Sequence, residues 1–144
     1  MSSEMDFKLH PQLIADSMHL ARLDLCEVRI INDANYPWFL LVPQRNGLVE
    51  LHDLTLDEQQ LLTIESRLLS GAIINCFAPD KLNVASIGNM VSQLHVHHIA
   101  RFKTDLAWPK PVWGLFEAKP YEQGQLSERI ESMHTCLKAN KGSI

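Results

Sequence analysis

Apolar and polar positions along the chain form patterns that predict helices and strands in alternation. Residues 10–23 place apolar side chains near helical spacing, so a first helix is expected there. Residues 26–32 alternate apolar with charged positions, which predicts a strand. Residues 38–43 are continuously apolar and predict a short central strand that is covered on both faces. The first third of the chain is therefore expected to be one helix and two strands.

The clearest helix signal follows in residues 55–79. Thr55 precedes Glu58 by three positions, the spacing of a capping box, in which the two side chains accept from each other's backbone amides. Apolar residues then recur every three or four positions, which predicts one stripe facing a core. The stripe consists of Leu61, Ile64, Leu68, Ala72, Ile73 and Cys76, and Pro79 ends the helix.

The second half of the chain predicts a hairpin and a last helix. Residues 81–89 and 92–101 are expected to be antiparallel strands joined by a tight turn at Gly88-Asn89. Residues 107–114 contain prolines that exclude a helix or a central strand, and 127–140 predict the final helix. Paired strands between helices indicate an α+β fold, an antiparallel sheet with helices packed on one face.

Composition narrows the class of protein. A chain of 144 residues with 46% hydrophobic content suits a single domain over residues 1–144. The net charge is −4, without a run of Lys or Arg, so binding to a nucleic acid polymer is not expected. No apolar run reaches the roughly 18 residues of a membrane span, and the first residues lack the apolar core of a signal peptide. Three cysteines without CxxC spacing suit a reducing compartment, so we expect a cytoplasmic protein without membrane contact.

Candidate chemistry lies in residues 93–101, QLHVHHIAR, with three histidines in four positions. Side chains in a strand alternate between faces, so Gln93, His95 and His97 share one face. His98 falls on the apolar face, with Leu94, Val96 and Ala100, and is expected to pack beneath the helices or at a sheet edge. The scattered histidines are expected to have surface roles; they are His10, His19, His52 and His134.

Three interpretations of the pair His95 and His97 remain open on spacing alone. The two residues can be polar residues on a solvated sheet face. They can bind a metal, although a metal needs at least one further ligand, and no acidic residue follows before Asp105. They can also act in nucleophilic catalysis, because a neutral imidazole is a good nucleophile near pH 7 and a second histidine can donate to a phosphate oxygen.

QLHVHHIAR resembles the signature of the histidine triad (HIT) family, H-φ-H-φ-H-φ-φ with φ hydrophobic. His95 matches the middle histidine and His97 the last, whereas Gln93 takes the place of the first, as in a bacterial subgroup, and His98 lies at a φ position. The strand at 37–45, the predicted hairpin and the proline-rich 107–114 are also similar to the family. The resemblance covers about residues 8–118, which leaves 119–144 as a C-terminal helical extension.

The resemblance implies a five-stranded antiparallel sheet and a homodimer. It also implies a hydrolase or transferase for nucleoside phosphoramidates or dinucleoside polyphosphates, with no metal and no cofactor. His95 would attack the α-phosphate and form a covalent nucleotidyl-histidine. His97 would contact the phosphate and help the leaving group, and Gln93 would orient His95 or contact the phosphate. Trp38 replaces a further histidine common in the family.

Substrate contacts are expected from five more residues. Asn32 and Asp33 resemble the place where the family holds the ribose, although both also suit a turn. Asn83 and Asn89 are candidates for hydrogen bonds to the phosphate, with plain edge and turn roles as the alternative. Trp113 would stack on the substrate or close the site from a partner subunit, unless it only packs. The other functions considered are a nucleotide-binding regulatory protein with little catalysis and a metal-binding β protein.

Overall fold

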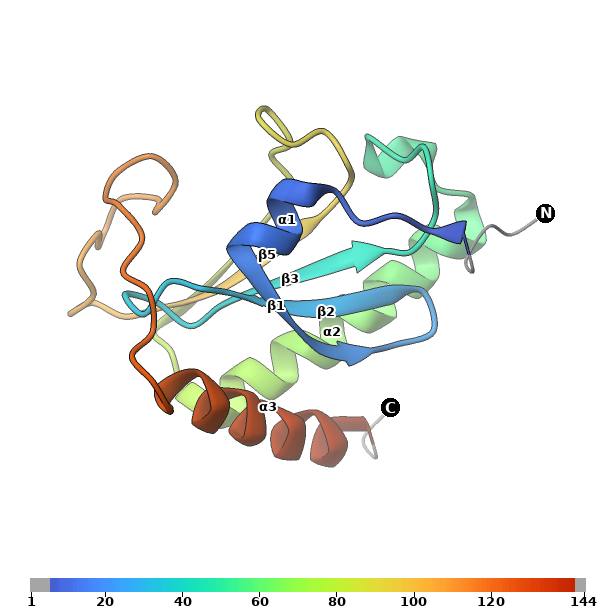
Figure 1. The fold of residues 1–144 in the computed structure, drawn as a ribbon. Coiled ribbons are helices and arrows are strands. Elements are labelled where there is room, and N and C mark those ends of the chain that lie inside the picture. Colours follow the sequence, from blue (N-terminus) through green and yellow to red (C-terminus); the bar gives the residue numbers. More distant parts are fainter. Residues whose placement is uncertain (1–5, 142–144) are drawn as a thin grey trace.

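The structure of the protein is a computed structural model that describes residues 6–141 (Figure 1). A five-stranded antiparallel sheet forms its centre, which confirms the predicted α+β fold. In chain order the elements are α1 (Pro11–Asp16), β1 (Ser17–Arg22), β2 (Cys26–Ile31), β3 (Trp38–Pro43), the 3-10 helix η2 (Leu51–Asp53), α2 (Leu56–Phe77), β4 (Lys81–Ala85), β5 (Val96–Arg101) and α3 (Gln125–Lys141).

The strand order is β1-β2-β3-β5-β4, so β3 lies in the middle of the sheet. Five of its six residues are buried, as expected for a continuously apolar strand covered on both faces. β3 pairs with β5, and Leu40 lies opposite His97. The sheet therefore fixes β5 between two antiparallel neighbours, which determines the direction of every side chain on it.

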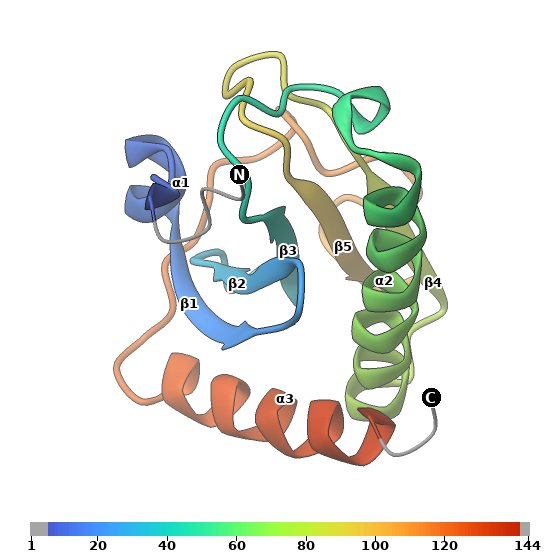
Figure 2. The ribbon, with the colours of Figure 1, turned by 90° about the vertical axis from the view of Figure 1, so that its right-hand side faces the viewer.

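Helices α2 and α3 cover one face of the sheet, with α2 beside β5 and β4 and α3 below β1 and β2 (Figure 2). The predicted capping box at the start of α2 is confirmed. Thr55 Oγ1 accepts from the Glu58 amide at 3.2 Å, and Glu58 Oε1 accepts from the Thr55 amide at 2.9 Å. α3 contributes Met133 and Leu137 to the main core, so this helix packs into the same core as the sheet.

The buried stripe of α2 differs in part from the predicted one. Ile64 is 46% exposed, whereas Leu62 and Glu65 are buried. Glu65 is placed inside because its two carboxylate oxygens accept from the amides of Leu25 and Cys26, each at 2.8 Å. A buried carboxylate with two amide donors keeps its hydrogen bonds on folding. The apolar spacing alone gave no sign of this partner on a distant segment.

The prediction of one helix over residues 10–23 is wrong in its second half. α1 has six residues and is followed directly by the edge strand β1. The pairing of β1 with β2 shifts register between His19 and Ala21. A bulge of this kind interrupts the alternation of side chains, so the strand lacked its period of two. α1 packs against the outer face of the sheet, the face away from α2 and α3, through Leu13 against Leu40 and Val42.

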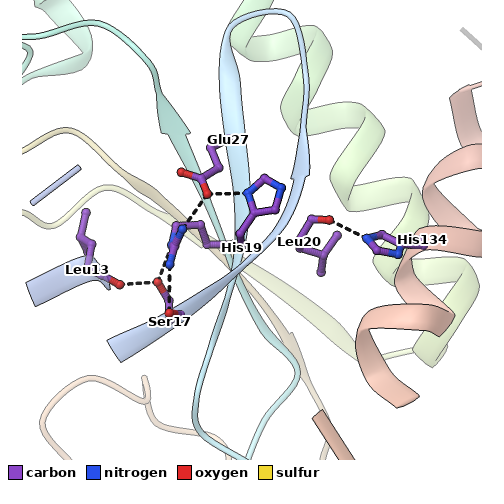
Figure 3. A network of polar contacts seen from close by, with 7 residues as sticks. Leu13, Ser17, His19, Leu20, Glu27 and His134 are labelled. Atoms are coloured by element: carbon purple, nitrogen blue, oxygen red, sulfur yellow. Dashed lines mark hydrogen bonds and ion pairs between the residues drawn. The ribbon is translucent and has the colours of Figure 1, made fainter. Parts of the chain in front are cut away.

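A polar network anchors α1 to β1 and β2 on that outer face (Figure 3). Arg29 Nη1 donates to Glu27 Oε2 at 2.6 Å, and Arg29 Nε donates to Ser17 Oγ at 2.7 Å. The Ser17 hydroxyl donates to the Leu13 carbonyl, and His19 Nδ1 lies 2.6 Å from Glu27 Oε2. The buried arginine and glutamate thus satisfy each other.

The other scattered histidines have local structural contacts or are exposed. His10 Nδ1 accepts from the Gln12 amide at 3.0 Å and caps α1. His134 Nε2 lies 2.5 Å from the Leu20 carbonyl, joining α3 to β1 (Figure 3). His52, in η2, is exposed. None of them is close in sequence or hydrogen-bonded to the pair on β5.

The predicted antiparallel pairing of β4 with β5 is confirmed, but the tight turn at Gly88-Asn89 is not. Residues 86–95 connect the strands, because the Leu94 amide donates to the Leu48 carbonyl at 3.0 Å rather than to β4. The segment 107–114 has no helix or strand, as predicted. In the part of the chain from 6 to 141, no helix is long and apolar enough to cross a membrane.

Candidate active site

The two faces of β5 separate the histidines as the alternation predicted. His98 points toward α2 and is fully buried. Its Nε2 lies 2.7 Å from Ser66 Oγ, and its Nδ1 lies 3.2 Å from the Val96 carbonyl. Both ring nitrogens therefore have partners. Burial lowers the pKa of His98 to about 4, so the ring is neutral in the folded protein.

His95 lies immediately before β5 and is 6% exposed. Its Nδ1 is 2.7 Å from the backbone carbonyl of Gln93. A carbonyl oxygen only accepts, so Nδ1 carries the proton and Nε2 carries the lone pair. Among residues 6–141, no side chain or backbone group makes a hydrogen bond with Nε2. The local backbone thus prepares this nitrogen for reaction with a ligand.

His97 is the next residue on the same face and is held from the opposite side. Trp38, the first residue of β3, donates from its indole Nε1 to Nδ1 of His97 at 2.9 Å. The His95 and His97 ring centroids are 5.0 Å apart. Burial, followed by the charges of His95 and His98, lowers the pKa of His97 to about 3. His97 is accordingly a neutral imidazole whose proton is on Nε2.

Aromatic rings enclose this pair of histidines. The Trp113 ring lies 5.3 Å from that of His97 and 6.2 Å from that of Trp38, both edge to face. Trp113 Nε1 is buried and finds no hydrogen-bond partner within residues 6–141. Trp38 and Trp113 pack onto a small apolar cluster distinct from the main core; its buried members are Tyr36, Ile99, Ala107 and Val112.

The arrangement is the start of β5, where His95 and His97 lie on one face and His98 on the other. The HIT domain family model matches residues 13–104, which is more than half of the chain. The chain belongs to the HIT domain family. A search of curated proteins gave no match.

Solved HIT structures agree with the assignment. A histidine triad protein from Marinobacter aquaeolei VT8 is 42% identical, with a TM-score of 0.89, over 92% of this chain and 97% of the other. One from Bradyrhizobium japonicum is 40% identical, with a TM-score of 0.89, over 91% and 98%. One from Sinorhizobium meliloti 1021 is 36% identical, with a TM-score of 0.90, over 92% and 98%.

Gln93 stands at the first triad position of this HIT chain, but its side chain turns to the N-terminal segment. Oε1 accepts from the His10 amide at 2.8 Å, and Nε2 donates to the Lys8 carbonyl at 2.9 Å. His95 is oriented by the backbone of Gln93 and not by its amide group. Gln93 thus contacts His95, as one of the two predicted roles has it, but through its backbone carbonyl; a contact of Gln93 with the phosphate stays a prediction.

Asn32 and Asp33 hydrogen-bond to the segment that leads from Trp113 to α3. Asn32 Oδ1 accepts from the Tyr121 amide at 3.0 Å. Asp33 Oδ1 accepts from the amides of Asn35 at 2.9 Å and Lys119 at 3.2 Å. Both side chains thus fix this segment, and within residues 6–141 no hydrogen bond links them to His95 or His97.

Asn83 belongs to a second polar cluster on the outer face. Its Oδ1 accepts from Arg101 Nη1 at 2.8 Å. The buried Arg101 and the half-buried Asp105 form a two-point ion pair, with Nε to Oδ2 at 2.8 Å and Nη2 to Oδ1 at 3.1 Å. Asn89 lies exposed in the loop before the site. Of the five residues predicted to contact the substrate, only Trp113 lies directly against a site histidine, with its ring against that of His97.

Two important residues were missed by the sequence reasoning as parts of the site. Asp105 accepts from the amides of Phe102, Ala107 and Trp108 and so shapes the loop that carries Trp113. The i, i+4 spacing from Arg101 was the only sign of it. Trp38 was treated as a lost histidine, yet it is the hydrogen-bond donor to His97.

A metal site at the pair would need at least one further ligand. Within the described residues, no group of three or more His, Cys, Asp or Glu side chains is placed to hold an ion. The indole N–H of Trp38 occupies His97 Nδ1, one of the two ring nitrogens through which an imidazole can bind a metal. The described residues thus offer the metal-binding interpretation no third ligand.

Proposed function

We propose that the protein is a nucleotide hydrolase or transferase that acts at the α-phosphate of nucleoside phosphoramidates or dinucleoside polyphosphates. The observation that carries the proposal is the state of His95, with Nδ1 bonded to a carbonyl at 2.7 Å and Nε2 open. A neutral imidazole with a free lone pair is a nucleophile at neutral pH. The family assignment supports the same chemistry.

In the proposed reaction, His95 Nε2 attacks the α-phosphorus and a nitrogen–phosphorus bond forms. The bond from phosphorus to the leaving group breaks, and its electron pair departs with that group. The ring becomes positively charged, and the Gln93 carbonyl stabilises that charge through Nδ1–H. Water then attacks the nucleotidyl-His95, the nitrogen–phosphorus bond breaks, and a nucleoside monophosphate is released.

His97 acts in this scheme as a hydrogen-bond donor to a non-bridging phosphate oxygen. Its ring is 5.0 Å from that of His95, so one phosphate group can contact both residues. Transfer of a phosphoryl-type group depends mainly on position and on stabilised charge, which neutral donors at a buried site can supply. His97 is suited to this role because its free nitrogen carries the proton.

The other substrate contacts stay predictions of the proposal. Asp33 Oδ2, which has no hydrogen-bond partner among residues 6–141, is the atom we assign to a ribose hydroxyl. Asn89, in the exposed loop, would contact the phosphate chain, and Trp113 the base or leaving group. A homodimer, a cytoplasmic location and activity without a cofactor are likewise expected from the resemblance and composition.

The test is intact-mass analysis after mixing the protein with adenosine 5′-phosphoramidate or a diadenosine polyphosphate, while AMP release is followed. Wild type should release AMP, with a transient adenylyl adduct. His95→Ala should show neither, and His52→Ala, which removes an exposed histidine, should match wild type. Turnover that survives in His95→Ala would show that His95 is not the nucleophile.

The second candidate is a nucleotide-binding regulatory protein on the same fold. One observation favours it: the side chain at the first triad position is committed to the N-terminal segment instead of the site. Tight AMP binding by calorimetry, with no adduct and no AMP release from any of the substrates, would establish this alternative against the hydrolase.

A further inference from the structure

Trp38 controls which nitrogen of His97 carries a proton. An indole N–H only donates, so the 2.9 Å contact requires a lone pair on His97 Nδ1. The proton of the neutral ring must then be on Nε2. A second proton on Nδ1 would bring two N–H groups against each other. The contact is formed between neighbouring strands, since Trp38 lies opposite Ile99 on β5.

The surroundings of His97 also oppose a positive charge. The ring is buried against Trp38, Trp113 and His95. No carboxylate forms an ion pair with it within residues 6–141. The charged groups nearest along the same face of β5 are Arg101 and its partner Asp105, which are bonded to each other. His98 lies on the opposite face. Burial and the neighbouring histidines hold the pKa of His97 far below neutrality.

Gln93 cannot replace the missing acid. An amide has no proton to give near neutral pH, and both ends of this one are bonded to the N-terminal segment. The proton on Nδ1 of His95 is held by the Gln93 carbonyl and faces away from Nε2. The three triad positions therefore supply hydrogen bonds and a nucleophile, but no general acid.

We propose that Trp38 is a positioning residue that fixes His97 as a neutral Nε2 donor, so that the site gives no proton to the departing group. This inference rests on the proposed function. When the His95–phosphorus bond forms, the leaving group must then take the electron pair as an anion. An oxygen leaving group of low basicity can do so, whereas an amine must first gain a proton from solvent.

Two AMP derivatives that differ only at the scissile bond test this point. One carries p-nitrophenol through oxygen, and the other carries p-nitroaniline through nitrogen. General acid catalysis contributes about 10²–10⁴-fold where it operates. For wild type, we expect the ratio of kcat/KM for the ester to kcat/KM for the amide to exceed the ratio of the two uncatalysed rates by at least about 10²-fold.

Substitutions at Trp38 should change that preference. Trp38→Phe keeps an aromatic ring but removes the donor, and Trp38→His offers a nitrogen that can accept from Nδ1–H. We expect the ester preference to narrow at least about tenfold in Trp38→His, because His97 can then be protonated. Tyr36→Phe is the matched control. The ring centroids of Tyr36 and Trp38 are 6.3 Å apart, and the buried hydroxyl of Tyr36 has no hydrogen-bond partner among residues 6–141.

A measurement that does not need turnover tests the role of Trp38 independently of the proposed function. Nitrogen-15 spectra of the His97 ring should show protonated Nε2 and unprotonated Nδ1 from pH 5 to 8, without titration. In Trp38→Phe the signals should indicate mixed tautomers. Titration of His97 in wild type within that range, or protonated Nδ1, would overturn the role of Trp38. An ester preference equal in wild type, Trp38→His and Tyr36→Phe would overturn the leaving-group inference.

Absence of turnover with both AMP derivatives, and also with adenosine 5′-phosphoramidate and diadenosine polyphosphate, would reject the proposed function and, with it, the leaving-group inference. The nitrogen signals would then decide the assignment of Trp38 alone. Turnover that depends on His95 but shows no ester preference would leave the proposed function standing and overturn the inference drawn from it.

Discussion

The histidines on the two sides of the sheet at β5 are buried to a similar extent, but their ring nitrogens are bonded differently. His98, against α2, has partners on both ring nitrogens. His95 and His97, on the outer face, each use Nδ1 in a hydrogen bond and leave Nε2 without one among residues 6–141. Exposure differs by only a few per cent, from 0% to 7%. Burial therefore does not distinguish the two sides; what differs is the number of ring nitrogens that have a hydrogen-bond partner, and on this difference the proposed reactive role of His95 rests.

The largest effect that tests this comparison is on activity. His95→Ala removes the open nucleophile, and we expect a fall in kcat of at least about 10⁴-fold. His98→Gln should keep kcat within a few-fold of wild type, because His98 faces α2. Both are measured as AMP release under saturating substrate. A comparable loss in both variants would mean that the two faces are not functionally separate.

The next effect is on stability in acid. The pKa of His98 is about 4 in the folded protein against 6.5 for an ordinary histidine, so below pH 6.5 the unfolded chain binds a proton that the folded chain does not. The free energy of unfolding should therefore fall between pH 6.5 and about 4, by up to about 3 kcal/mol from His98. His97 contributes in the same direction, with a folded pKa of about 3. Urea unfolding at pH 7 and pH 5 measures the fall.

His98→Gln is the control for the acid effect. Glutamine does not titrate, so the loss of stability from pH 7 to pH 5 should be smaller in this variant than in wild type. An equal loss would show that His98 is already protonated in the folded protein, or that another group governs the acid sensitivity.

A smaller effect comes from the partner of His98. Ser66→Ala leaves a buried ring nitrogen without its 2.7 Å contact, which should cost about 1–3 kcal/mol of unfolding free energy. AMP release should not change. Ser70→Ala, on the same helix and with no side-chain hydrogen bond within residues 6–141, should cost less. Unchanged stability in Ser66→Ala would mean that water replaces the hydroxyl.

The sequence was sufficient where a pattern was local and regular. Alternation along residues 96–101 placed His97 and His98 on opposite faces because β5 is a regular strand without a bulge. The capping box was equally visible, since its two residues are three positions apart. In β1, by contrast, the shift between His19 and Ala21 removed the period of two, and the strand was assigned to a helix.

The site depended on contacts that no local pattern records. Trp38 meets His97 across 59 positions of sequence. Gln93 meets the amide of His10 across 83. The family resemblance marked both positions as departures from a histidine pattern, but only the folded chain assigns their hydrogen bonds. Glu65, 40 positions from Leu25, was missed for the same reason.

The smallest expected effect concerns Gln93, whose backbone and side chain have different partners: the carbonyl contacts His95, and the amide group contacts the N-terminal segment. Gln93→Ala removes two bonds to the N-terminal segment, which should cost about 1–2 kcal/mol of unfolding free energy. It retains the carbonyl that orients His95, so kcat should fall less than about tenfold. Urea unfolding and AMP release measure the two effects. A fall of about 10²-fold or more, at unchanged stability, would assign the amide to the chemistry, since loss of a positioned catalytic group has effects of that size.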